Sequence, residues 1–240
     1  MTIQQLLSLM RRAINDFNMI EEGDKIAVGV SGGKDSLVLL QLLKAFQRFS
    51  DKKFQLMGIT IDMGFSQDAY KPIQEFCQQI GVEYHVVKTD IAEIIFDARK
   101  EKNPCSLCAK MRRGALNTEI VARGFNKLAL GHHKDDIVET FMLSLFHEGR
   151  LSTFQPKSYM SRMDVTLIRP MIYIEERDIV PLARTLPVVH NPCPANKHTE
   201  RESMKKVLKQ LSEQYPGISN KFANAIMHPE RYNLWDKTQK

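Results

Sequence analysis

Long uncharged apolar runs are missing from this sequence of 240 residues. A helix that spans a bilayer needs about 20 consecutive, mainly apolar residues. The first 20 residues carry apolar side chains at helical spacing, interrupted by charges, which is typical of neither a membrane span nor a secretory signal. We therefore expect a cytosolic protein without membrane association. Cysteine is also scarce, with four residues, and in the cytosol such cysteines more often bind metal or do chemistry than form disulfides.

Two common phosphate-binding motifs are missing as well, although the stretch GVSGGKDS (29–36) resembles a phosphate loop. A Walker A loop needs a leading glycine and a Ser or Thr after Gly-Lys. Here Val28 takes the leading position and Asp35 follows Lys34. The spacing of the glycines does not match the dinucleotide fingerprint G-x-G-x-x-G either. Both ATP cleavage between the β and γ phosphates and dinucleotide binding are therefore disfavoured.

The residues at 29–36 can nevertheless form an anion-binding turn. An apolar run precedes a Ser-Gly-Gly turn, and an apolar helix-like run follows it. Glycine lets the backbone amides approach a phosphate closely, and the start of a helix carries partial positive charge. Asp35 would repel a phosphate unless a cation lies between them, so we expect magnesium at this loop.

Strand-like and helix-like runs alternate along the chain. Strands are predicted at 25–30, 54–62, 83–88 and 127–131, and near 165–170. Helices are predicted at about 35–48, 68–80, 110–124, 134–147 and 175–185. This alternation predicts an α/β fold, a Rossmann-like parallel sheet with helices on both faces. We divide the chain into an N-terminal helix (1–22), a catalytic domain (23–186) and a helical C-terminal extension (187–240).

Unusual residues gather where predicted strands end, which in such sheets is the ligand-binding edge. The strand at 127–131 runs into GHHKDDIVET. Gly131 permits close backbone approach, and helix capping explains one of Asp135 and Asp136. Because carboxylates are preferred magnesium ligands, we expect one of the two at the metal or the α-phosphate. His132 and His133 fit a site and a structural role equally well.

The four cysteines allow several interpretations. Cys105 and Cys108, in NPCSLCAKMRRGAL, are one turn apart at a predicted helix start, where the helix end favours thiolates. A redox pair would belong to a different fold. Zinc needs four ligands, so Cys193 and Cys77 or a histidine would have to complete the set. An iron-sulfur cluster on three cysteines would leave one iron open. Cys77 lies on the apolar face of a helix and fits a buried small hydrophobe.

The motifs together resemble a known family. SGGKDS is similar to the signature of the PP-loop ATP pyrophosphatases, which split ATP between its α and β phosphates and adenylate a substrate oxygen. With CSLCAKMRRGAL, LALGHHKDDIVET, IRPMIY and a late lone cysteine, residues 10–215 resemble the tRNA 2-thiocytidine synthetases. The related tRNA 2-thiouridine synthetases share this layout. Longer members carry a second cysteine where Asn196 stands here and continue beyond residue 240.

The resemblance implies roles for particular residues. Lys34 would neutralise the departing pyrophosphate, and a [4Fe-4S] cluster would have one iron free to carry sulfide. Arg112 and Arg113 would lie between the cluster and the nucleotide and would stabilise phosphate or bound RNA. The loop residues implied to hold pyrophosphate are Ser31, Gly32, Gly33 and Ser36. Those implied to face the nucleoside are Asp62 and Met63. Those implied to hold the cluster are Cys105, Cys108 and Cys193. A plain turn-capping role for Asp62 is equally consistent with the sequence.

The expected enzyme uses ATP and Mg²⁺ to adenylate the C2 carbonyl of a tRNA cytidine and then inserts sulfur. The net charge of +6 and the predicted basic helix, with Lys197, Arg201, Lys205, Lys206 and Lys209, agree with a polyanionic partner. A sulfur donor such as a cysteine desulfurase is the second expected partner, and a homodimer is left open. The rivals are a 2-thiouridine synthetase, a lysidine-synthetase-like ligase, which would not need three cysteines, and a zinc-stabilised RNA-binding module.

Overall fold

The computed structural model describes residues 1–64, 69–98, 104–189, 193 and 200–235. Its chain divides into two compact units. The first unit comprises Met1–His133 and Gln155–Lys197, and the second comprises Lys134–Phe154 and His198–Lys240. These are units of packing, and the sequence-based division at residues 22 and 186 stays a prediction.

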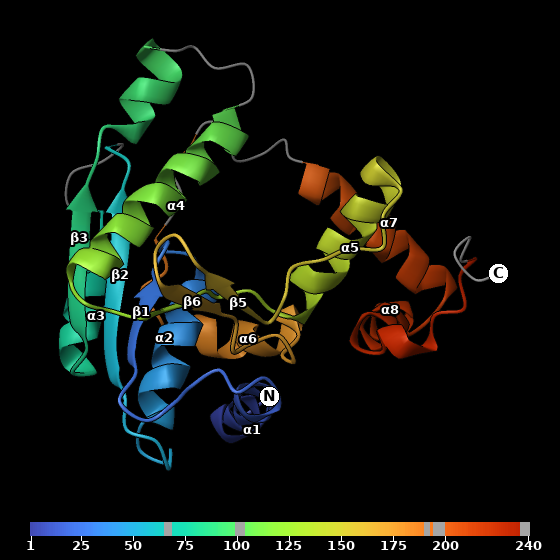
Figure 1. Ribbon diagram of the computed structural model, residues 1–240, viewed down its shortest axis with the longest axis horizontal. Coiled ribbons are helices and arrows are strands. Elements are labelled where there is room, and N and C mark those ends of the chain that lie inside the picture. The colour runs from blue at the N-terminus through green and yellow to red at the C-terminus, as the bar shows by residue number, and fades with distance from the viewer. Residues whose placement is uncertain (65–68, 99–103, 190–192, 194–199, 236–240) are drawn as a thin grey trace. The chain divides into compact units, whose positions relative to one another are not determined.

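A six-stranded sheet forms the centre of the first unit (Figure 1). Its spatial order is β3-β2-β1-β4-β6-β5, and every neighbouring pair is parallel except β5 and β6. The predicted α/β fold with a parallel sheet is confirmed. The sequence did not reveal β5, because its four residues, KSYM, are half polar and too short to show alternation. The strands are β1 (Lys25–Gly29), β2 (Gln55–Asp62), β3 (Glu83–Lys88), β4 (Lys127–Ala129), β5 (Lys157–Met160) and β6 (Val165–Ile168).

Helices cover both faces of this sheet. On one face, Ile120 of α4 packs on a buried apolar cluster from four strands, which comprises Ala27, Met57, Ile59, Leu128 and Val165. On the other face, Leu40 of α2 lies against Gly58 of β2, and α2 also contacts α1 and α6. Burial of these apolar side chains on both faces is what holds a parallel sheet together. The helices of this unit are α1 (Ile3–Asp16), α2 (Lys34–Phe46), α3 (Lys71–Gln79), the π-helix η1 (Glu93–Ala98), α4 (Pro104–Ala122) and α6 (Glu176–Ala183).

The strand order determines where a ligand can bind. The first three strands of the chain run outward from β1 in one direction, and β4 begins the other half of the sheet on the opposite side of β1. A crevice opens at such a reversal, beyond the carboxyl ends of the two central strands. The carboxyl end of β1 leads into Ser31–Ser36, and that of β4 leads into Gly131. The fold therefore brings these two segments together.

The second unit is built from three helices, α5 (Lys134–Glu148), α7 (Glu200–Gln214) and α8 (Ile218–Met227), followed by the 3-10 helix η2 (Pro229–Arg231). Phe141, Met204 and Ala223, one from each helix, belong to its apolar core. Glu139, 3% exposed, is neutralised there by Arg201 at 3.0 Å. None of the described helices, in either unit, is long and apolar enough to cross a membrane.

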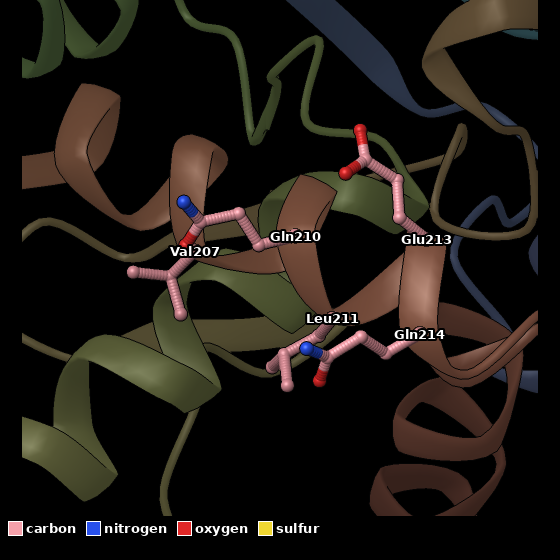
Figure 2. A pocket seen from close by; sticks show the side chains of 5 residues that line it. All are labelled: Val207, Gln210, Leu211, Glu213 and Gln214. Carbon is pink, nitrogen blue, oxygen red and sulfur yellow. The ribbon is translucent and has the colours of Figure 1, made fainter.

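A surface hollow of about 440 Å³ lies on α7 (Figure 2). Its lining residues are Val207, Gln210, Leu211, Glu213 and Gln214. These five side chains include no cation and no sulfur. The hollow therefore offers neither the phosphate-binding nor the thiolate chemistry predicted from the sequence.

Candidate functional site

The loop after β1 is held in shape by its own polar groups. The hydroxyl of Ser36 accepts from the backbone N of Ser31 at 3.1 Å and donates to the backbone O of Gly33 at 2.9 Å. The backbone N of Gly33 donates to the Ser31 hydroxyl at 3.3 Å. Gly32 has φ of +85°, a conformation that L side chains rarely adopt, so the turn requires glycine there. Ser31, Gly32, Gly33 and Ser36 thus form one compact turn.

Helix α2 starts directly from this turn. Its N-cap is Gly33, which supplies no side-chain hydrogen bond to the free amides of the first turn. The end of a helix of 13 residues therefore offers N–H groups and partial positive charge to an anion. Gly131 lies directly against the same turn, because a Cβ on it would be 2.9 Å from the carbonyl carbon and oxygen of Asp35. Glycine at 131 is thus a steric requirement for joining the ends of β1 and β4.

Lys34 connects two carboxylates at the start of α2. Its Nζ lies 3.0 Å from Asp35 Oδ1 and 2.7 Å from Glu176 Oε1, at the first residue of α6. Burial lowers the pKa of Lys34, but the hydrogen bond to Glu176 and the charge of Asp35 raise it by more, so its pKa is above the usual value. Lys34 is therefore a firmly charged ammonium. His133, 3% exposed, approaches Asp35 Oδ1 through Nε2 at 3.9 Å.

Asp62 and Met63 follow β2 at the same edge of the sheet. One carboxylate oxygen of Asp62 accepts from the backbone N of Gly64 at 3.0 Å, which is the turn-capping role considered from the sequence. Met63 is 9% exposed and belongs to an apolar cluster with Ile61 and Ile95. The thiol of Cys108 donates to Met63 Sδ at 3.4 Å. The end of β2 and Cys108 of α4 are therefore in direct contact.

The three predicted cluster cysteines lie in two segments of the first unit. Cys105 and Cys108 are in the first turns of α4, and Cys193 lies between residues that the structure does not describe. Burial raises the pKa of Cys108, with further contributions from the neighbouring Cys193 and Cys105, and Arg112 only partly opposes them. Burial is the largest of these effects on the pKa of Cys108, and the expectation that the helix end favours a thiolate stays a prediction.

The donor chemistry suits a soft metal centre, since Cys105, Cys193 and Arg112 all act on the Cys108 thiol. No group of three His, Cys, Asp or Glu side chains in the described residues could hold a metal ion as it stands. Cys77, predicted to be buried, is 1% exposed, and burial raises its pKa to about 11.

The two arginines of α4 act on different groups. Arg112 donates to Cys108 and lowers the pKa of that thiol. Burial and the charge of Asp62 raise the pKa of Tyr70, and Arg112 lowers it. Arg113 instead acts on Arg169, just beyond β6. Tyr70, Arg169 and Glu176 were missed by sequence reasoning. Arg169 and Glu176 stand in or near the quoted IRPMIY stretch, but no spacing rule distinguishes them from ordinary surface charges.

Asp135 and Asp136 lie at the start of α5, in the second unit. Asp136 Oδ1 accepts from Arg201 at 2.8 Å, and Arg201 also bonds Glu139. Of the predicted basic helix, Arg201, Lys205, Lys206 and Lys209 lie on α7, and Lys197 lies outside the described residues. A magnesium role for Asp135 or Asp136 stays a prediction, and for Asp136 it would compete with Arg201.

Comparison with known proteins decides the family. A model of the PP-loop domain matches residues 4–211. The chain is 40% identical to a tRNA-cytidine(32) 2-sulfurtransferase of Geobacter metallireducens, over 94% of this chain and 90% of that protein. The protein of the same name from Bdellovibrio bacteriovorus is 38% identical over 94% of this chain and 88% of its own length. This chain belongs to the tRNA-cytidine(32) 2-sulfurtransferase family. The predicted resemblance to PP-loop tRNA thiolation enzymes is confirmed.

Solved structures agree with this assignment. The U34-tRNA thiolase NcsA from Methanococcus maripaludis, solved with its [4Fe-4S] cluster, has a TM-score of 0.76 and 25% sequence identity. It matches over 98% of this chain and 81% of its own. An NMN synthetase from Francisella tularensis, at 14% identity and a TM-score of 0.53, shares the fold. Members of this 2-sulfurtransferase family thus share their architecture with an iron-sulfur thiolase.

Proposed function

We propose that this protein is an ATP-dependent tRNA sulfurtransferase that converts a cytidine to 2-thiocytidine. The observation that carries the proposal is that a phosphate-binding loop and cysteine thiols lie at the same edge of one sheet. A PP-loop with a free helix start follows β1. The Cys108 thiol, on which Cys105 and Cys193 both act, lies beside the end of β2. The relatives of this chain are named for cytidine 32 of tRNA, so we propose that this cytidine is the substrate. It lies in the anticodon loop, where a base is easily unstacked.

The first step is adenylation. The C2 carbonyl oxygen of cytidine attacks the α-phosphorus of ATP, the bond from this phosphorus to the bridging oxygen breaks, and pyrophosphate leaves. We assign the binding of pyrophosphate to the amides and hydroxyls of Ser31–Ser36 and the neutralisation of its charge to Lys34. Asp35 would orient the cation that accompanies ATP. We propose magnesium there, because a carboxylate beside phosphates needs an intervening charge.

The second step replaces oxygen by sulfur. Sulfide adds to C2, and AMP then departs with the original oxygen, because adenylation has turned a poor leaving group into a good one. Cys105, Cys108 and Cys193 would hold a [4Fe-4S] cluster, which supplies a site for the sulfide when it is bound. Arg112, which acts on both Cys108 and Tyr70, would stabilise anionic groups near the thiols. A cysteine desulfurase as sulfur source, a homodimeric state and a cytosolic location remain proposals.

The test is deletion of the gene in its host, followed by mass spectrometry of nucleosides from digested tRNA. We expect 2-thiocytidine to disappear and to return with the wild-type gene but not with Cys193→Ala. Loss of a 2-thiouridine with unchanged 2-thiocytidine would assign the enzyme to uridine instead. If no thionucleoside changes, the thiolation function is wrong. A purified protein that holds zinc and no iron after anaerobic reconstitution would revive the zinc-stabilised RNA-binding module.

A further inference from the structure

Arg169 is held in a fixed position at the carboxyl end of β6. It follows Ile168, whose carbonyl accepts from the backbone N of Leu130 at 3.0 Å, so Arg169 stands beside the chain that leads from β4 to Gly131. The residue is 8% exposed. Its Nε donates to His132 Nδ1 at 3.2 Å, and one terminal nitrogen donates to the carbonyl of Gln155. A guanidinium restrained in this way costs little further entropy when it binds a ligand.

Arg113, on α4, acts on Arg169 through its charge. Leu116, one turn further along that helix, packs over the strand ends, since a Cβ on Gly29 would lie 3.3 Å from Leu116 Cδ2 and 3.0 Å from Leu130 Cδ2. Residues three apart share a helix face, and Arg113 precedes Leu116 in the direction of the carboxyl edge. Burial lowers the pKa of Arg169 to about 10, and the charge of Arg113 contributes to the decrease. The two cations therefore act on each other.

His132 adds a third donor to this pair. Because its Nδ1 accepts from Arg169, a neutral ring must carry its proton on Nε2. Two guanidinium groups and an imidazole N–H thus gather around the ends of β4 and β6. Like charges repel one another, and an anion bound between them removes that repulsion while gaining charge-assisted hydrogen bonds.

We propose that Arg113, Arg169 and His132 form a binding site for a phosphodiester group of the RNA substrate, separate from the loop that binds ATP. The proposal rests on the proposed function. The ATP loop follows β1 and has its own cation, Lys34, whereas these three residues cluster beyond β4 and β6. Arg112 acts on the thiols. The site would therefore anchor the RNA backbone on the side of the crevice opposite the cysteines.

The test compares Arg113→Gln with Arg123→Gln in the full-length protein. Arg123 directly follows the end of the same helix and pairs with Glu119 at 3.3 Å, but it lies about 15 Å further along the helix axis than Arg113. The dissociation constant of an unmodified tRNA transcript is measured over a range of salt concentrations, and that of ATP is measured separately. For Arg113→Gln we expect weaker RNA binding, a salt slope smaller by about one, and ATP affinity within twofold of wild type. Arg123→Gln should change none of these quantities.

Charge-conserving variants separate a lost ion contact from a folding defect. Arg113→Lys and Arg169→Lys should keep the wild-type salt slope, and Arg169→Gln should lose about one unit. Wild-type RNA binding and slope in Arg113→Gln would overturn the site and leave the thiolation function intact. Loss of ATP affinity with normal RNA binding would also overturn it, because the site would then hold a nucleotide phosphate. A wild-type protein with no salt-dependent RNA binding would overturn both proposals.

Discussion

The two halves of the candidate site are built differently. The PP-loop is one continuous segment whose hydroxyls and amides already bond one another, and Gly131 locks it against the end of β4. The thiol half combines Cys105 and Cys108 on α4 with Cys193, which lies 85 residues beyond Cys108 in the sequence. The comparison teaches that phosphate binding is preorganised by local sequence, whereas metal binding requires assembly from distant parts.

The largest effect on activity is expected from substitutions in the PP-loop. Lys34→Ala and Asp35→Ala should each reduce RNA-dependent AMP and pyrophosphate formation by at least a hundredfold, because each removes a charge at the reacting phosphates and nothing from the apolar core. The measurement is pyrophosphate release at saturating tRNA, with iron content determined in parallel. AMP formation at the wild-type rate in both variants would contradict the assignment of the loop.

Substitution of the three cysteines should abolish iron binding without changing the PP-loop. Cys105→Ala, Cys108→Ala and Cys193→Ala should each lose bound iron and sulfur transfer after anaerobic reconstitution, since each removes one of three thiol ligands. Cys77→Ala is the matched control, because Cys77 is a buried thiol on α3 whose high pKa disfavours the thiolate. Iron and a visible absorption spectrum retained in the Cys193 variant would show that the late cysteine is not a ligand.

The contact between β4 and the loop gives a smaller, steric effect. Gly131→Ala places a methyl group 2.9 Å from the backbone of Asp35, so the turn must shift and ATP should bind about tenfold more weakly. Gly114→Ala is the control, because nothing lies within 4 Å of that position and alanine favours a helix. Isothermal titration with ATP measures both. Equal ATP affinities of the Gly131→Ala and Gly114→Ala variants would mean that the turn moves to accept the methyl group without weakening ATP binding.

The smallest effect is expected at Glu176. A phosphate that binds Lys34 has to compete with Glu176, and a half-exposed ion pair of this kind contributes up to about 1 kcal/mol. Glu176→Gln should therefore strengthen ATP binding by up to about fivefold, whereas Glu175→Gln, the same change at the neighbouring residue, should not. Weaker ATP binding in Glu176→Gln would show instead that this carboxylate helps to bind the nucleotide.

Local signals predicted much of this molecule. Apolar periodicity located five of the six strands and most helices, and the pattern SGGKDS located the loop, because both are properties of contiguous residues. Strand β5 and the π-helix η1 were missed, since their short segments carry no clear period. Glu176 and Arg169 were missed because their roles arise where α6 and β6 meet residues remote in sequence. Burial raises the pKa of Cys108, and sequence alone does not reveal burial at the start of α4.

The most direct test of the central claim follows both steps in one reaction. Protein reconstituted with iron and sulfide without oxygen is mixed with ATP, magnesium, sulfide and unmodified tRNA, and AMP and 2-thiocytidine are counted together. The account predicts one 2-thiocytidine per AMP in the wild type. It predicts no 2-thiocytidine from Cys193→Ala and no AMP from Lys34→Ala. Formation of 2-thiocytidine without ATP, or at the wild-type yield in Cys193→Ala, would contradict it.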